Sequence, residues 1–239
     1  MQKVSWLLIT VLFCSCGTYR YYAPTANPAL FKHAGEVHLS GDIGSSGAAA
    51  KAGVSLTNRM AIMGQYNGGL GKYQSSEGEI AMGYYRAMKS YPLGFFLAGG
   101  YGFGSNFAYA DSARTIKAYE GSFSKPFVQL NYGVNGGTIL SGLKADAIFI
   151  LKASYFSYTG NHINVTNDRI RSEYTILEPA IMLGLGSRSI RFDIIYGLPF
   201  KAGFLVPLSS YSNARTFPLN VSFGIRFLLG QKELEPAKP

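Results

Sequence analysis

Charged side chains recur at alternate positions in several apolar stretches of this 239-residue chain. Asp146 and Lys152 are in phase within one stretch, and Arg191 and Asp193 are in phase within another. Because alternate residues of a β-strand face the same side, these acids and bases share a face. Opposite charges confined together favour pairing, since an unpaired buried ion loses its solvation. The predicted salt-bridge network consists of Glu79, Lys144, Asp146, Lys152, Glu178, Arg191, Asp193 and Arg226.

The three histidines, His33, His38 and His162, are the main candidates for catalysis. His38 alternates with Glu36 on a polar face, which indicates a hydrogen-bonding role. His162 lies in an Asn-rich segment, where a solvated loop residue is the simplest interpretation. Ser157 and His162 are the only pair that we consider for an enzyme at a rim. No catalytic motif accompanies them, so we expect no enzymatic activity, no metal site and no cofactor.

The first 16 residues indicate export. A basic residue, an apolar run over residues 4–13 and the small residue Ser15 before Cys16 have the layout of a secretory signal. The run is shorter than the roughly 20 residues that span a bilayer. We predict a signal peptide over residues 1–15, and Cys16 resembles the lipidated first residue of a bacterial lipoprotein. A plain secretory signal cut nearby is the alternative. Both cysteines lie in this region, so a disulfide or cysteine-based metal site in the body is excluded.

Composition favours strands in the body of the chain. The 29 glycines, 17 tyrosines and 16 phenylalanines, with only 15% charged residues, suit twisted sheets. The net charge of +9 comes from scattered lysines and arginines, so we expect no nucleic-acid partner. Exported anionic partners such as lipopolysaccharide fit this charge better.

Apolar and polar residues alternate with period two through ten stretches. The expected strands are 35–44, 48–57, 60–67, 78–86, 93–104, 126–135, 143–158, 173–186, 189–200 and 217–228. Each is near or above the roughly 9 to 11 residues that a tilted strand needs to cross a bilayer. We therefore predict an all-β fold, an antiparallel up-and-down transmembrane β-barrel of about 10 strands, with about 8 to 12 possible.

The expected connections alternate in length, as in transmembrane barrels. If the first strand runs outward, the periplasmic turns are 58–59, 87–92, 136–142 and 187–188. The external connections are 45–47, 68–77, 105–125, 159–172 and 201–216, and four of these five are long. This arrangement places both chain ends in the periplasm.

Aromatic residues near the strand ends favour a membrane barrel over a soluble sandwich or lipocalin-like barrel, the structural alternatives. The expected girdle residues are Tyr66, Tyr84, Tyr132, Tyr155, Tyr174, Tyr196 and Phe227. The final strand, LNVSFGIRF, resembles the C-terminal insertion signal of outer-membrane barrels at Gly224 and Phe227. The chain as a whole resembles small outer-membrane β-barrel lipoproteins of Bacteroidota.

That resemblance implies four parts: a signal peptide at 1–15, a lipidated periplasmic linker at 16–34, a transmembrane barrel at 35–228 and a periplasmic tail at 229–239. It implies outer-membrane lipids, lipopolysaccharide and the barrel-insertion machinery as partners. The residues of the linker either lie across the periplasmic mouth or against a partner, or form a flexible tether. Ser112, in the sequence Asp-Ser-Ala, is similar to the acceptor of O-linked glycans in Bacteroidota.

We expect a structural, assembly or binding role with a plugged polar lumen. A narrow pore for small solutes is the alternative, and an enzyme at the barrel rim is a third possibility.

Overall fold

The computed structural model describes residues 26–69, 73–88, 92–109, 117–140, 142–162, 169–201, 206–207 and 220–230, all of them strands or connections. No helix among the described residues is long and apolar enough to cross a membrane. The strands are β1 Val37–Gly44, β2 Gly47–Ser55, β3 Met60–Gly68, β4 Tyr73–Ala87, β5 Leu93–Tyr109, β6 Lys117–Leu140, β7 Leu143–His162, β8 Arg169–Gly186, β9 Ile190–Gly197, β10 Phe200–Lys201, β11 Val206–Pro207 and β12 Asn220–Leu229.

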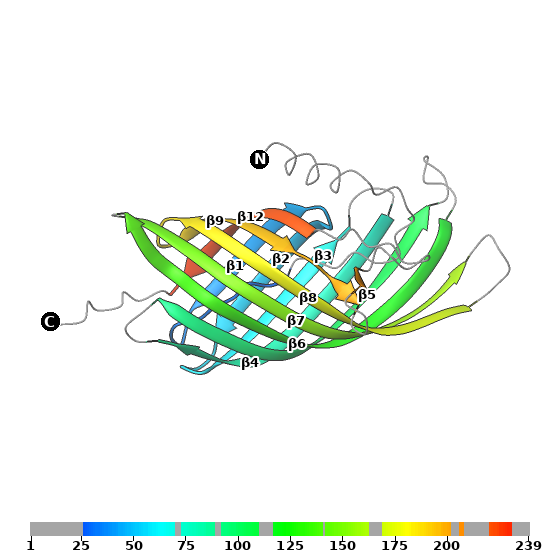
Figure 1. Cartoon of the computed structure of the whole chain (residues 1–239), viewed down its shortest axis with the longest axis horizontal. Helices are drawn as coiled ribbons and strands as arrows, with labels where there is room; N and C mark the ends of the chain where they lie inside the picture. The colour runs from blue at the N-terminus through cyan, green and yellow to red at the C-terminus, as the bar shows by residue number, and fades with distance from the viewer. Residues whose placement is uncertain are drawn as a thin grey trace.

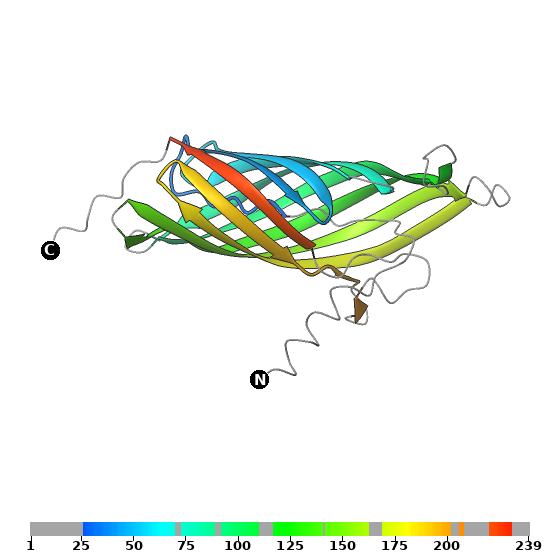
Figure 2. The ribbon, with the colours of Figure 1, turned by 90° about the horizontal axis from the view of Figure 1, so that it is seen from above.

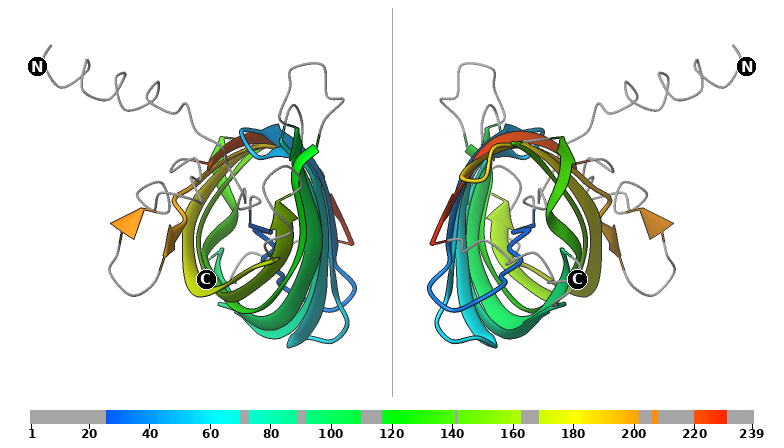
Figure 3. Two further views of the ribbon diagram at one scale, coloured as in Figure 1. Left: turned by 90° about the vertical axis from the view of Figure 1, so that its right-hand side faces the viewer. Right: turned by 90° about the vertical axis from the view of Figure 1, so that its left-hand side faces the viewer.

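Ten of these strands close into an antiparallel barrel, which confirms the predicted fold class. Each strand from β1 to β9 pairs with the next, and β12 pairs with both β9 and β1. The seam between β1 and β12 runs from Val37 opposite Leu229 to Gly44 opposite Ser222. The short strands β10 and β11 extend the sheet beside β8. Figure 3 shows the closed wall from both ends of the barrel.

Strand lengths divide the barrel into two parts. Strands β1, β2, β3, β9 and β12 have 8 to 10 residues, whereas β5 to β8 have 17 to 24. The four long strands therefore continue beyond the short ones on one side of the barrel, as Figures 1 and 2 show. We call this continuation the projection; it comprises residues 104–109, 117–124, 156–162 and 169–175. The opposite end, where the hairpins turn tightly, is the short-turn end.

The predicted loop lengths are wrong in the long half of the barrel. The expected external connections 105–125 and 159–172 are mostly strand, because β5, β6, β7 and β8 continue through them. The two faces exchange character there, since serines and threonines face outward while Phe123, Phe156 and Tyr158 are buried on the inner face, so the apolar outward phase expected of a membrane strand ends. The expected turn 136–142 is also shorter than predicted. Register shifts let β6 continue to Leu140, and the chain turns next to Gly142, whose φ is +80°.

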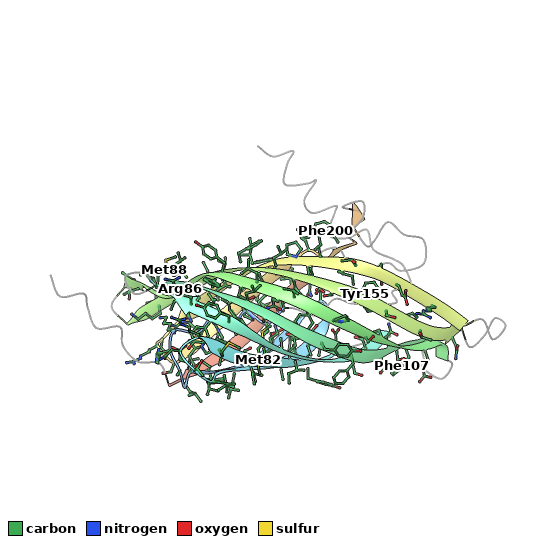
Figure 4. The ribbon with its side chains drawn as sticks, turned by 90° about the horizontal axis from the view of Figure 1, so that it is seen from below. Met82, Arg86, Met88, Phe107, Tyr155 and Phe200 are labelled. Atoms are coloured by element: carbon green, nitrogen blue, oxygen red, sulfur yellow. The ribbon has the colours of Figure 1, made fainter. Side chains whose placement is uncertain are left out.

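The outer wall carries an apolar belt. Along β7, Phe149, Leu151 and Tyr155 point outward and are 39 to 47% exposed. On β12, Phe223, Ile225 and Phe227 point outward and are 41 to 61% exposed. In Figure 4, Met88 lies near the short-turn end and Phe107 near the far end of the long strands. The belt ends on β7 at Tyr155, beyond which Ser157 and Thr159 face outward, while on β5 Phe107 continues the outward phase of Phe103. A belt of this kind matches the lipid-facing surface of a membrane barrel.

Most predicted girdle residues lie in this belt. Tyr66, Tyr132, Tyr155, Tyr196 and Phe227 are outward and at least 43% exposed. Tyr84 packs beside Phe95, with ring centroids 6.0 Å apart. The prediction for Tyr174 is wrong. It pairs across the strands with Phe156, and its ring lies 5.1 Å from that buried ring, so it shares the inner face.

Candidate functional site

The lumen is filled at the short-turn half by a segment of the chain itself. Residues 26–31, which we call the plug, precede β1 and are all buried inside the wall. The blue segment within the barrel in Figure 3 is this part of the chain. Ala26, Ala29, Leu30 and Phe31 join the hydrophobic core with wall residues of the inner face. From the sequence we expected the linker to lie across the periplasmic mouth or against a partner, or to form a flexible tether. Its residues 26–31 lie inside the barrel.

Amide side chains of β6 bind the main chain of the plug. Gln129 Nε2 donates to the Asn27 carbonyl oxygen at 2.7 Å, and Asn131 Nδ2 donates to the carbonyls of Asn27 and Ala29 at 3.0 and 2.8 Å. Asn135 Nδ2 donates to the Leu30 carbonyl at 2.6 Å. These wall amides are spaced by two and four residues, which places all three on the inner face of one strand. The wall thus satisfies carbonyl groups that burial removes from water.

The other side of the plug contacts β2 and β3. Lys51 Nζ donates to the Ala26 carbonyl oxygen at 3.2 Å while forming a 2.7 Å ion pair with Asp42. The Asn27 side-chain amide donates to the carbonyl oxygens of Ala52 and Gly64, at 3.2 Å each. The plug is therefore tied to opposite parts of the wall.

The Phe31 ring occupies an aromatic pocket. It stacks on His38 with centroids 4.7 Å apart and meets the Phe96 ring edge-on at 5.7 Å. Tyr85 lies at 5.6 Å. An ideal Cβ at Gly53 would lie 2.9 Å from the tip of the Phe31 ring, so the absence of a side chain there makes room for it. Pairs of rings at these distances add to the stability that apolar burial provides.

A buried carboxylate, that of Glu36, holds the chain between the plug and β1. It accepts a hydrogen bond from the Lys32 main-chain N–H at 2.9 Å and lies 3.0 Å from His33 Nδ1. Ser55 Oγ donates to the His33 carbonyl at 2.6 Å and accepts from the Glu36 N–H at 2.8 Å. Burial lowers the pKa of the Lys32 ammonium, and the charges of Glu36 and Asp146 oppose that shift. These contacts fix the turn from plug to wall.

Two ionic clusters lie along the inner wall. The rim cluster, at the short-turn end, consists of Asp146, Arg191, Asp193 and Arg226. Arg191 Nε lies 3.2 Å from Asp146 Oδ2, and Arg226 reaches the same carboxylate at 2.5 Å and Asp193 at 2.9 Å. All four side chains are at most 5% exposed. An ideal Cβ at Gly184 would lie 2.5 Å from Asp193 Oδ1, so a glycine leaves the space that the cluster needs.

The central cluster lies further along the lumen and consists of Glu77, Glu79, Lys125, Lys152 and Glu178. Lys125 Nζ lies 2.5 Å from Glu77 Oε1 and 2.7 Å from Glu79 Oε1, and Lys152 Nζ lies 2.5 Å from Glu79 Oε1. Ser154 donates to Glu178 at 3.1 Å. Both lysines have no exposed surface. Because buried charges need partners, this layer stays together and fills the lumen beyond the plug.

The structure brings most of the predicted network residues together. Seven of them are buried in the two clusters: Glu79, Asp146, Lys152, Glu178, Arg191, Asp193 and Arg226. Lys144 lies elsewhere; its Nζ donates to Thr138 Oγ1 at 2.6 Å in an exposed position. Glu77 and Lys125 belong to the central cluster although their segments were expected to be loops.

One feature of the sequence could have indicated that the lumen holds a plug. Ile148 and Ile150 fall in the polar phase of β7, between Asp146 and Lys152, and both are buried inward. Apolar side chains in the inward phase require an apolar occupant. The predicted lipidation site Cys16 and glycosylation site Ser112 lie outside the described residues, as does the side chain of His162. Among the described residues, no group of His, Cys, Asp or Glu could hold a metal ion.

The chain resembles known proteins only weakly. No protein-family model and no curated protein matches the sequence. In-vitro folded OmpT, an outer membrane protein of Vibrio cholerae, is 10% identical over 81% of this chain and 95% of its own, with a TM-score of 0.17. Its loop L8 deletion mutant is 9% identical over 81% of this chain and 97% of its own, also with a TM-score of 0.17. Both similarities are weak.

Proposed function

We propose that this chain is a non-enzymatic outer-membrane β-barrel with a closed lumen and a structural, assembly or binding role. The observation that carries the proposal is the filled interior. The rim cluster, the plug and the central cluster follow one another along the lumen, and their side chains are buried. A barrel of eight strands has an interior just filled by side chains, and ten strands leave only slightly more space.

The outer surface supports a location in the outer membrane. The belt on β12 and β7 exposes large apolar side chains that a soluble protein would bury or cover. Each short strand is close to the length that crosses a bilayer, and the projection then extends into the medium. Outer-membrane lipids contact the belt in this proposal, lipopolysaccharide surrounds its outer edge, and barrel-insertion machinery recognises β12.

Solute exclusion tests the closed lumen. Proteoliposomes that contain the native protein should swell in arabinose-sized sugars no faster than empty liposomes, while a general porin serves as the positive control. The double variant Arg191→Ala with Lys152→Ala opens both clusters and should swell faster. Rapid swelling with the native protein would contradict the proposal and favour the narrow pore.

The lipid anchor and the orientation complete the proposal. We expect Cys16 to carry the lipid, so Cys16→Ser should abolish fatty-acid labelling while the barrel still inserts. With both chain ends in the periplasm, a thiol reagent should label Ser122→Cys on intact cells and Ala34→Cys only after permeabilisation, each relative to the native chain. The reverse pattern would overturn this orientation.

A further inference from the structure

The plug occupies a pocket whose lining differs from the rest of the lumen. The inner wall around it is apolar, with Phe96, Ile148, Ile150 and Met182 at most 1% exposed. Beyond the plug, the inner wall carries the charged central cluster. A pocket with apolar walls and a few convergent polar groups has the general character of a binding site. Its occupant here is residues 26–31, a piece of chain outside the strands.

The polar groups of this pocket recognise main chain. Five hydrogen bonds from Lys51, Gln129, Asn131 and Asn135 end on carbonyl oxygens of residues 26, 27, 29 and 30. Every peptide has such carbonyls. These contacts therefore select the backbone conformation of the ligand and select little of its sequence. The pocket around Phe31 supplies the sequence preference, since Gly53 and three aromatic partners accommodate one ring.

The barrel wall is complete without the plug. β1 pairs with β2 and with β12 over its whole length, from Val37 to Gly44. None of these ladder positions involves residues 26–31. The connection between plug and wall is exposed at Ala34 and Gly35, and Gly35 has a φ of +84°, which other residues rarely adopt. The segment is thus attached to the wall by a short exposed link at the short-turn end.

We propose that this half of the lumen is a peptide-binding site, and that residues 26–31 are a tethered occupant that an extended peptide of the same chemistry can replace. The ligand class is a short apolar peptide with an aromatic residue at the position of Phe31, entering from the short-turn end. This assigns a ligand to the binding role proposed above and rests on it. Detergent-solubilised protein tests it, so a failure here is distinct from a failure of the swelling experiment.

The experiment begins with the full chain, folded, with a protease site inserted between Ala34 and Gly35 and cut after folding. The severed segment should exchange with a fluorescent peptide of sequence ANPALFKHA, as followed by anisotropy and mass spectrometry. Asn131→Leu removes both hydrogen bonds from Asn131 to the bound segment and should weaken peptide binding on the order of 30-fold, from about 1 kcal/mol for each of these two bonds. The matched control Asn67→Leu changes a buried amide of β3 that makes no described contact with the plug, and should change affinity less than about twofold.

Three results would overturn the proposal. The severed segment fails to exchange, the barrel loses its strand structure when the segment leaves, or Asn131→Leu and Asn67→Leu weaken peptide binding equally.

The uncut chain gives an independent measurement by hydrogen exchange. Asn131→Leu should accelerate exchange of residues 26–34 by about tenfold or more while the ladder amides of β6 keep their rates. Equal acceleration of both would show that the plug opens only with the barrel and would also reject the proposal.

Discussion

The closed half of the barrel, which all ten strands of the wall form, and the projection, which only β5 to β8 form, are stabilised by different forces. In the closed half, the inner face holds paired charges and the plug. In the projection, rings cover inward glycines: Phe123 lies over Gly104 of β5, and Tyr158 lies over Gly121 of β6 and Gly160 of its own strand. Phe156 joins these rings, 5.1 Å from Phe123. A closed wall can bury charge because strands from several sides contribute partners, as Asp146 of β7 and Asp193 of β9 do for Arg226, whereas an open sheet relies on contacts between adjacent strands.

The largest expected effect is the loss of a buried charge partner in the closed half. Arg226→Ala leaves Asp146 and Asp193 with one fewer cation and should lower the free energy of unfolding by about 3 to 5 kcal/mol. Arg171→Ala removes an exposed pair with Glu173 in the projection and should cost less than about 1 kcal/mol. Urea unfolding in lipid vesicles measures both. Similar losses would mean that the two halves do not differ as described.

A second comparison places a charge on the outer face of each half. Ile225→Arg lies in the belt and should destabilise the inserted barrel by about 2 to 4 kcal/mol if it faces the middle of the bilayer. Ser122→Arg faces outward from the projection and should change the unfolding free energy by less than about 0.5 kcal/mol. Equal tolerance in the same unfolding assay would show that the belt does not face lipid.

Two glycine substitutions compare how crowded the inner and outer faces of the wall are. Gly184→Ala would crowd Asp193 in the rim cluster and should cost about 1 to 3 kcal/mol. Gly99→Ala, on the outer face of β5, meets no atom within 4 Å and should be nearly neutral. Thermal unfolding followed by circular dichroism distinguishes the two. A neutral Gly184→Ala would indicate that the cluster has room to rearrange.

The smallest effect on global stability is expected in the projection. Phe156→Ala removes the central ring of its aromatic group and should accelerate amide exchange in residues 156–162, with less than about 0.5 kcal/mol lost from global unfolding. Phe96→Ala, beside the plug, should instead lower global stability by about 3 to 5 kcal/mol. A global loss from Phe156→Ala would mean that the projection unfolds together with the barrel.

The fold was predictable because lipid and lumen impose opposite chemistry on alternate residues. Phe223, Ile225 and Phe227 point outward while Ser222 and Arg226 point inward, as the period-two pattern requires. The same logic found most of the ion pairs, since the charges of β7, β9 and β12 lie in the inward phase. The strand ends in the projection were missed because the phase reverses there: Ser122 and Ser124 face outward, and the apolar residue between them, Phe123, is buried on the inner face.

The plug was not predictable from its own residues. Its contacts are hydrogen bonds to main-chain carbonyls, which every segment possesses, and its short sequence has no period. The information lies in the wall, where Ile148 and Ile150 break the polar phase and Gly53 leaves room for a ring. Recognising such a site from sequence requires knowing which strands face one another.

The seam between β1 and β12 has a consequence for how the chain folds. The first and last strands of the wall pair with each other, so the barrel cannot close until the final residues have arrived. Until then both strands present open edges, and open edges are templates for pairing with other chains. Pairing of residues so distant in sequence is also slow, because a long loop must be ordered first. The incompletely folded protein therefore exposes both edge strands and the plug segment at the same time. Chaperones that carry the chain to the membrane would have to shield the edges of β1 and β12.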